Sequence, residues 1–311
     1  MTKSWKDSIY LQREALARQL REPMARLAEQ CAPVWGDREQ LNAALMRGFA
    51  DIPYCKFLYC VDMHRHQICD NVAQGALAPG HFGRDRSRRP YFKEAMPPWG
   101  FLLSDAYISL IGQRPSLTAL QVVSADAGPS GYLGADFDLR DLPVTAELYD
   151  EPAYWRQVKG DPAIRGTVFQ QCRVESPLDR NVDQAISILE ELLTQRGVFQ
   201  CQIHFSSSQA TIWTVDDPFR YRMLDHEALS DPDICLVYPP QPYPLDAAVP
   251  QPDIRRILHL MRALRLADPN IYLRTSSINL FNGMISLTFS CDGSHYMSYV
   301  EFLMKDTSFW F

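Results

Sequence analysis

Residues 55–142 constrain the fold most strongly, because short apolar runs alternate there with turn residues. Residues 55–72 predict two strands joined by a turn at Met63–His66. Three more strands are expected in "LLSDAYISLIG", "PSLTALQVVSA" and "SGYLGADFDL", which Gly and Pro separate. A sheet of such strands with helices packed against it is an α+β arrangement, and we expect the sheet to be antiparallel.

Helices are predicted on both sides of the first strands. Residues 4–31 carry an apolar stripe at helical spacing, and Pro23 is expected to kink this helix or divide it in two. Asp37 is the predicted N-cap of a second helix, with Gln40 three residues on as its capping-box partner. A third, short helix is expected to begin at Pro90, where the missing N–H of proline costs nothing.

A second domain is predicted after a segment rich in Pro, Asp and Glu at 141–161. We expect domains at 1–150 and 160–311, the second also α+β and of unknown role. Its predicted elements are a helix capped by Asp179, a hairpin across "SSS", a proline-rich loop, a helix at 253–266, and three terminal strands in "NIYLRTSSI", "GMISLTFSC" and "HYMSYVEFLM".

Composition argues against several classes of protein. The net charge of −6 gives no general case for binding nucleic acid or an anionic membrane surface. No 18-residue apolar run and no secretory h-region occur, so we expect a cytoplasmic protein without a membrane span. The eight cysteines include no C-x-x-C pair, which disfavours a zinc ribbon or a thioredoxin-type site, and no cofactor or metal is expected.

The segment "GRDRSRRPYFKEAM", residues 83–96, is the strongest candidate for a binding site. It places Arg84, Arg86, Arg88 and Arg89 within six residues, and a guanidinium matches a carboxylate with two parallel hydrogen bonds. The helix expected at Pro90 would add free N–H groups and a positive dipole end. The alternative is that these arginines are solvated or pair with acidic neighbours, namely Asp85, Glu94 and Asp105.

Four segments in order resemble a Cache domain, a PAS-like sensor domain common in bacterial receptors. They are "FLYCVDMHRHQI", "DRSRRPYFKEA", "SDAYISLIGQRPSLTALQVV" and "GYLGADFDLRDL", and the resemblance covers about residues 37–143. It implies a sheet that forms one wall of a pocket for amino acids, small carboxylates or amines. Residues 160–311 are not covered by it.

The resemblance implies a set of ligand-binding residues. Arg89 stands where the family often has an arginine for the ligand carboxylate, flanked by Tyr91 and Phe92. Tyr107 lies on the pocket wall, and Asp136 on the last strand can meet a ligand amine. The complete predicted set is Arg86, Arg89, Tyr91, Phe92, Tyr107, Ser109 and Asp136.

The chain departs from the amino-acid-binding members of the family at three positions. Tyr91 stands where a tryptophan is usual, Arg84 where a tyrosine is usual, and Ser109 where a second aspartate tends to occur. A ligand amine would therefore lose a partner, which favours an acid without the amine. Without the resemblance, Asp136 and Asp138 share one strand face that could equally point to solvent.

Other clusters are interpreted as structural. His64 and His66 fall in a predicted turn and do not indicate a metal site, and 224–229 is expected at the surface. The stretch 289–297 holds Cys291 and His295, but a base beside its nucleophile in sequence rarely has the required geometry. It is expected to be a hairpin turn on Asp-Gly.

Taken together, these patterns predict a cytoplasmic, bacterial, non-enzymatic sensor that binds a small carboxylate or related metabolite. We expect a homodimer and an unknown signalling partner. The N-terminal helix is interpreted either as a dimer or relay element or as a helix that simply covers the sheet. The alternatives are an enzyme with an inter-domain active site and an adaptor that binds no ligand.

Overall fold

The computed structural model describes residues 4–97, 100–125, 128–146, 149, 172–291, 293–305 and 307–310. The chain divides into two compact units, residues 1–147 and 148–311. Most of the predicted boundary segment at 141–161 lies outside the described residues. None of the described helices is both long and apolar enough to cross a lipid bilayer.

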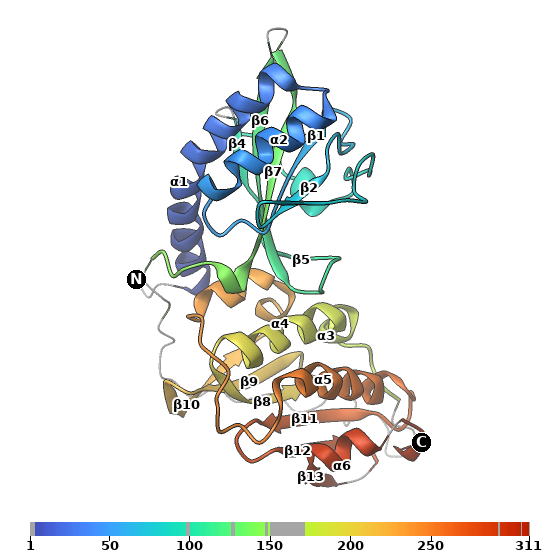
Figure 1. Ribbon diagram of the computed structural model, residues 1–311. Helices are drawn as coiled ribbons and strands as arrows, with labels where there is room; N and C mark the ends of the chain where they lie inside the picture. The colour runs from blue at the N-terminus through green and yellow to red at the C-terminus, as the bar shows by residue number, and fades with distance from the viewer. Residues whose placement is uncertain are drawn as a thin grey trace. The chain divides into compact units, whose positions relative to one another are not determined.

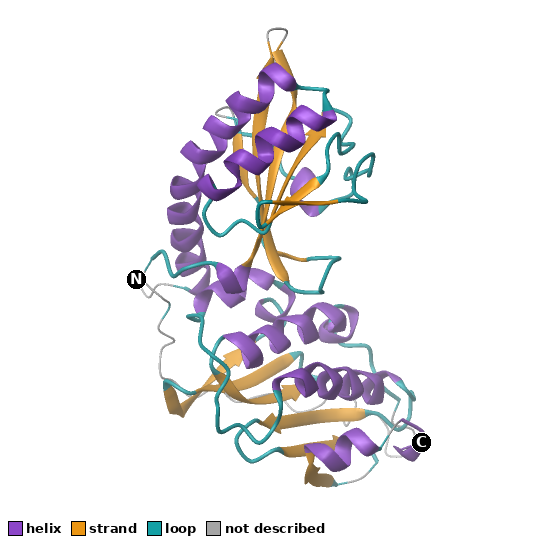
Figure 2. Ribbon diagram, in the orientation of Figure 1, coloured by secondary structure: helices purple, strands orange, loops and turns teal. Residues whose placement is uncertain are grey.

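The first unit is built on a mixed-length antiparallel sheet (Figures 1 and 2). The strand order is β3-β2-β1-β7-β6-β4, and β5 pairs with the free length of β6. The long strands β6 and β7 pair with each other, and both were predicted as strands. The strands are β1 (Phe57–Asp62), β2 (Asn71–Ala73), β3 (Ala76–Ala78), β4 (Phe101–Leu103), β5 (Tyr107–Ile108), β6 (Pro115–Ala125) and β7 (Gly128–Asp138).

Helices α1 (Trp5–Cys31) and α2 (Arg38–Gly48) cover one face of this sheet (Figure 2). Leu20 and Met24 are fully buried on either side of Pro23, and α1 continues through the proline. Of the two outcomes expected at Pro23, a kink or a division, the division is therefore wrong. Proline removes one helical hydrogen bond, but burial of the apolar stripe on both sides holds the helix together.

Capping by Asp37 is confirmed. Its carboxylate accepts hydrogen bonds from the backbone N–H groups of Glu39 and Gln40, at 3.0 and 3.1 Å, and from the Gln40 side chain at 2.8 Å. The two backbone bonds satisfy donors that have no partner inside the helix. The predicted capping box does not form, because Gln40 bonds the Asp37 carboxylate while the Asp37 N–H donates to the Val34 carbonyl.

The helix predicted at Pro90 is wrong in length. Pro90–Phe92 form a single 3₁₀ turn, too short to supply a helix dipole. Two prolines follow at positions 97 and 98, and the residue before a proline avoids the helical conformation. Other 3₁₀ turns of this unit are Ala32–Val34, Phe49–Asp51 and Leu139–Asp141.

The second unit contains another antiparallel sheet, in the order β10-β9-β8-β11-β12-β13. Helices α4 and α5 pack against each other and against its central strands β8 and β11. The strands are β8 (Val198–His204), β9 (Gln209–Thr214), β10 (Asp217–Leu224), β11 (Leu273–Asn279), β12 (Met284–Phe289) and β13 (Ser294–Ser298). The helices are α3 (Pro177–Arg180), α4 (Val182–Gln195), α5 (Gln251–Leu266), α6 (Tyr299–Met304) and α7 (Thr307–Trp310), with 3₁₀ turns at Ala228–Ser230 and Pro232–Val237. Both units are thus α+β, which confirms the predicted fold class.

Three local predictions for this unit need correction. The helix predicted to be capped by Asp179 is α4, and its N-cap is Asn181. Asp179 lies in the preceding α3, where it is the capping-box partner of the N-cap Ser176. The last predicted strand ends at Ser298, because the Ser298 hydroxyl accepts a hydrogen bond from Glu301 N–H and starts α6. Strand β10 was not predicted.

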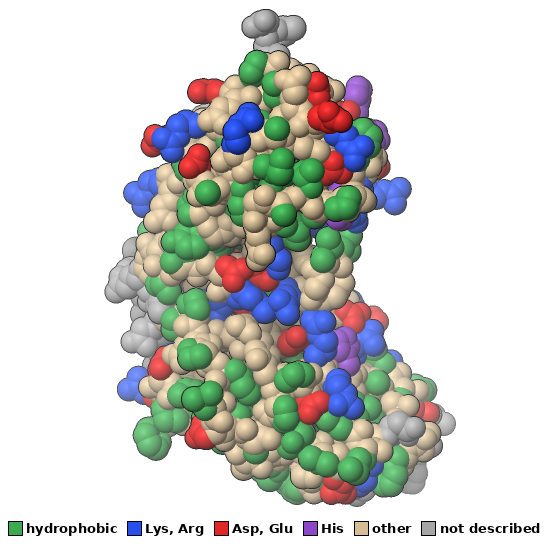
Figure 3. All heavy atoms as spheres, viewed as in Figure 1, with side chains coloured by type: hydrophobic (Ala, Val, Ile, Leu, Met, Phe, Trp, Pro, Cys, Tyr) green, Lys and Arg blue, Asp and Glu red, His purple; other side chains and the backbone are tan. Residues whose placement is uncertain are grey.

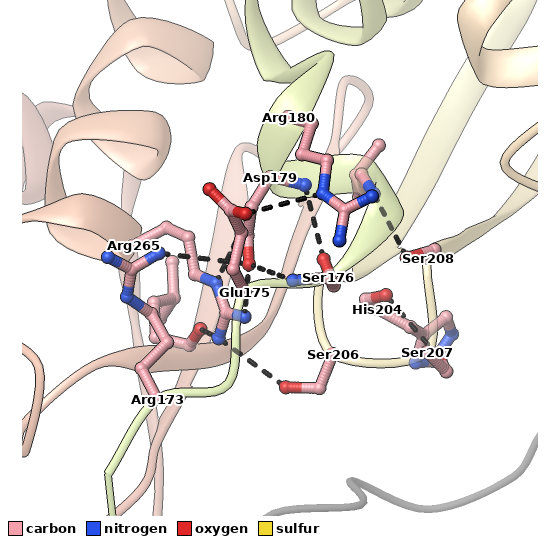
Figure 4. Close-up of polar contacts among 12 residues, drawn as sticks. Arg173, Glu175, Ser176, Asp179, Arg180, His204, Ser206, Ser207, Ser208 and Arg265 are labelled. Carbon is pink, nitrogen blue, oxygen red and sulfur yellow. Dashed lines mark hydrogen bonds and ion pairs between the residues drawn. The ribbon is translucent and has the colours of Figure 1, made fainter.

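A buried ion pair lies between α3 and α5 (Figure 4). The Arg265 guanidinium donates two hydrogen bonds of 2.8 Å to the two carboxylate oxygens of Asp179, and both side chains are almost fully buried. Arg265 also donates to the Leu273 carbonyl at 3.0 Å, and Ser176 N–H donates to Asp179 at 2.9 Å. Through these hydrogen bonds, Arg265 of α5 connects α3 to the first residue of β11.

On the face drawn in Figure 3, apolar side chains are interspersed with charged and polar ones on each unit. That view therefore shows no continuous apolar face of the kind expected at a large permanent interface.

Candidate functional site

A cavity in the first unit is formed by β1, the ends of β5, β6 and β7, and the arginine-rich loop before Pro90. Its charged lining residues are Lys56, Arg84, Arg86, Arg89 and Asp136. Uncharged polar atoms come from Asn71, Tyr107, Ser109 and Ser116, and apolar contact from Phe57, Leu110, Ile111 and Phe137. Four cations therefore face one carboxylate.

Arg86 is buried and its guanidinium is held on several sides. It donates to the Gln67 side-chain oxygen at 2.9 Å, to the Tyr91 hydroxyl at 3.1 Å and to the Asn71 side-chain oxygen at 3.3 Å. It also lies 3.7 Å from the centre of the Tyr59 ring. Burial lowers the pKa of Arg86, but Tyr59, Tyr91 and Asp136 outweigh it, so the pKa is raised. Arg86 is a fixed charge that organises the wall.

Asp136 is held by the same network. One carboxylate oxygen, Oδ1, accepts hydrogen bonds from the Tyr59 hydroxyl at 2.8 Å and the Thr118 hydroxyl at 2.7 Å. The Tyr59 hydroxyl is also 3.0 Å from that of Tyr91. Burial, followed by the Asp136 charge, raises the pKa of both Tyr59 and Tyr107, so these phenols stay protonated donors. Within the described residues, no side chain donates to the other oxygen, Oδ2.

Arg89 differs from Arg86 because its guanidinium is held mainly by ring contacts and not by a set of side-chain hydrogen bonds. It is half-buried, lies over the Tyr107 and Tyr91 rings at 5.3 and 5.8 Å, and lines the cavity. No carboxylate of the described residues lies within ion-pair distance of it. Burial lowers the pKa of Arg89, but Tyr107, Tyr91 and Asp136 outweigh it and raise the pKa. The cavity therefore contains a permanent cation that can receive an anion.

The other predicted site residues are placed as follows. The Tyr107 hydroxyl is 2.7 Å from the Thr118 hydroxyl and lies at the cavity, as does Ser109, whose hydroxyl donates to the Ile111 carbonyl. Tyr91 is fully buried behind Arg86. Phe92 packs against Tyr91 and Tyr132, so it supports the wall from behind. Ligand binding by the predicted set stays a prediction.

Tyr59 was missed by sequence analysis, although Asp136 depends on it. It pairs across β1 and β7 with Gly134, and an added Cβ at Gly134 would lie 2.4 Å from the Tyr59 ring. The glycine thus makes room for the ring that Arg86 covers. The alternation of β1 could have shown that Phe57 and Tyr59 share a face, but not which residue lies opposite. Lys56, Asn71, Arg84 and Thr118 were also left out of the predicted set.

The other clusters that the sequence singled out form neither a metal site nor a nucleophile–base pair among the described residues. Among the described residues, no group of three or more His, Cys, Asp or Glu side chains is arranged to hold a metal ion. Cys291 and His295 line a second cavity, of about 350 Å³, in the second unit. No hydrogen bond joins these two side chains, and His295 packs edge-on against Phe289 and Trp310. The hairpin that joins β12 and β13 is confirmed, although Asp292 in its turn lies outside the described residues.

No family model and no curated protein matches the chain. Solved structures that match include an extracellular ligand binding receptor from Desulfohalobium retbaense, at 16% identity and a TM-score of 0.34, over 43% of this chain and 25% of that one. The ligand-binding domain of the Campylobacter jejuni chemoreceptor Tlp3, in complex with 4-methylisoleucine, matches at 14% identity and a TM-score of 0.33, over 46% and 65%. That of the Pseudomonas fluorescens chemoreceptor CtaA, in complex with L-alanine, matches at 14% and 0.33, over 44% and 57%.

This chain thus spans less than two thirds of each of those chains. These neighbours are receptor ligand-binding domains, similar at low identity and over part of each chain. Membership of the Cache family stays a prediction.

Proposed function

We propose that the first unit binds a small organic acid and that the chain acts as a sensor rather than an enzyme. The observation that carries this is Arg89, a half-buried cation at a cavity with no carboxylate of the described residues within ion-pair distance. A ligand carboxylate can accept two parallel hydrogen bonds from such a guanidinium. The excess of cations over carboxylates in the lining supports an anion.

Asp136 sets the polarity of the other end of the ligand. Its Oδ1 is held by Tyr59 and Thr118, while Oδ2 can accept a further hydrogen bond. A hydroxyl or an amine beside the ligand carboxylate would supply that donor. Tyr107 and Tyr91 stack at the side of Arg89 and would exclude water from the ion pair.

The test is a thermal-shift and calorimetric screen of the full chain against small carboxylates, their primary amides and amines. A ligand at 100 times its dissociation constant adds about 2.7 kcal/mol of stability, which is readily seen as a raised melting temperature. We expect carboxylates to bind and the matched amides to bind at least about tenfold more weakly.

Arg89→Ala is expected to lower the affinity for the best carboxylate by about 30-fold or more, because it removes a charged hydrogen-bond partner from a half-buried site. Arg88→Ala is the matched control, since Arg88 is exposed and does not line the cavity. Carboxylate binding that survives Arg89→Ala, or a screen in which no acid binds, would refute the proposal.

A further inference from the structure

A second group of cations lies next to the cavity, around Asp138. This carboxylate is almost fully buried and is approached by three basic side chains. Lys56 Nζ lies 3.2 Å away, Arg140 Nε 3.2 Å and Arg114 3.9 Å. One carboxylate balances one positive charge, so the group keeps positive charge in excess even with Arg140 fully paired.

Two of these cations retain donors for a ligand. Lys56 has three N–H donors and a 42% exposed side chain, and among the described residues its ion pair is with Asp138. The Nε atom of Arg114 is buried and has no hydrogen-bond partner among the described residues. This N–H can therefore donate to a bound group.

This group meets the cavity that Arg89 lines at Lys56, whereas Arg114 and Arg140 lie beside Asp138 and are not lining residues. Lys56 lines the cavity, and its backbone N–H donates a hydrogen bond of 2.8 Å to the Asp136 carbonyl. Asp136 and Asp138 are two residues apart on one face of β7, which separates their Cα atoms by about 7 Å. Ser116, which pairs with Asp138 across β6, also lines the cavity. The group around Asp138 therefore adjoins the cavity at Lys56 and Ser116.

We propose that the preferred ligand is a small dicarboxylate, with one carboxylate at Arg89 and the other at Lys56 and Arg114. This inference rests on the proposed function of the same cavity. The cavity has a volume of about 50 Å³, which is room for only a few water molecules. This small size favours an acid of four or five carbons. Asp138 lies within ion-pair distance of both Lys56 and Arg114 and so holds the two cations near each other.

Comparing succinate with succinamate tests the second carboxylate site, because the amide keeps the size of the molecule and removes one of its two charges. We expect the full-length protein to bind succinate at least about tenfold more tightly than succinamate or butyrate in calorimetric titrations. In Lys56→Gln, the affinity for succinate is expected to fall about tenfold, to that for succinamate. Arg114→Gln is expected to lower it in the same direction.

Lys93→Gln is the control, since it makes the same change in net charge at an exposed residue outside the cavity lining. Equal affinities of the wild type for succinate, succinamate and butyrate, all lost in Arg89→Ala, would overturn the dicarboxylate inference and leave the proposed function standing. Absence of binding by all three acids, with no other acid bound in the wider screen, would overturn both. Lys56→Gln that retains the full preference for succinate would also overturn the inference.

Discussion

Replacing Arg265 by methionine is expected to lower the free energy of unfolding of the second unit by about 3–5 kcal/mol. The substitution leaves the Asp179 carboxylate buried without the two hydrogen bonds of 2.8 Å that it accepts from the guanidinium. Arg173 lies 3.7 Å from the same carboxylate and compensates only in part. The Leu273 carbonyl loses a donor as well.

Urea unfolding of the full chain, read by hydrogen exchange in peptides of α4 and β8, would isolate the effect in this unit. Arg256→Met is the matched control on the same helix, because the Arg256 side chain is 64% exposed and its ion pair with Asp253 is at the surface. We expect that variant to change stability by less than about 1 kcal/mol. Equal effects of the two substitutions would contradict the assigned role of the buried pair.

The same pair makes the stability of the second unit depend on pH. Burial raises the pKa of Asp179, but hydrogen bonds from Arg265 and Ser176 outweigh it, and the pKa lies below its ordinary value. The pair therefore stabilises the fold fully above the unfolded pKa of about 3.9, and this contribution is lost as the pH falls through the lower folded pKa. In Arg265→Met, the hydrogen bonds from Ser176 and the nearby charge of Arg173 remain, but loss of the Arg265 hydrogen bonds lets burial raise the Asp179 pKa above its wild-type value. The difference between the variant and the wild type should therefore shrink as the pH is lowered from 7 toward 4.

Gly134→Ala is expected to lower the affinity for the best carboxylate about tenfold and the stability of the first unit by about 1–3 kcal/mol. The added methyl would lie 2.4 Å from the Tyr59 ring, and Arg86 covers that ring at 3.7 Å. The ring must move, and its hydroxyl then leaves Asp136 Oδ1 with Thr118 as its hydrogen-bond donor. A change at a residue outside the cavity lining should thus alter the cavity wall.

Calorimetric titration and thermal melting of Gly134→Ala check this expectation. Gly293→Ala is the control, because an added Cβ there has no atom within 4 Å and the backbone is not in the left-handed region. Unchanged affinity in Gly134→Ala, together with unchanged stability, would show that the Tyr59 stack does not hold the site.

Much of the first sheet could be predicted from sequence alone. The segments that form β6 and β7 are apolar runs bounded by Gly and Pro, and that local pattern was enough to predict both as strands. The Asp37 cap was also predictable, because its partners lie two and three residues away. Pro23, by contrast, could not be judged locally, since burial of Leu20 and Met24 against the sheet decides whether α1 continues.

The arginine-rich loop shows where local pattern stops being informative. Sequence determined that residues 84–89 would present several guanidinium groups beside an aromatic pair, and it indicated Asp136 as a polar residue on the last strand. Tertiary structure decided that Arg86 is fixed against Tyr59 and Gln67, that Arg89 faces the cavity, and that Lys56 joins Asp138. The reason is physical: each of these partners comes from another strand or loop, and a shift of one residue in the β1–β7 register would turn Tyr59 to the opposite face of the sheet.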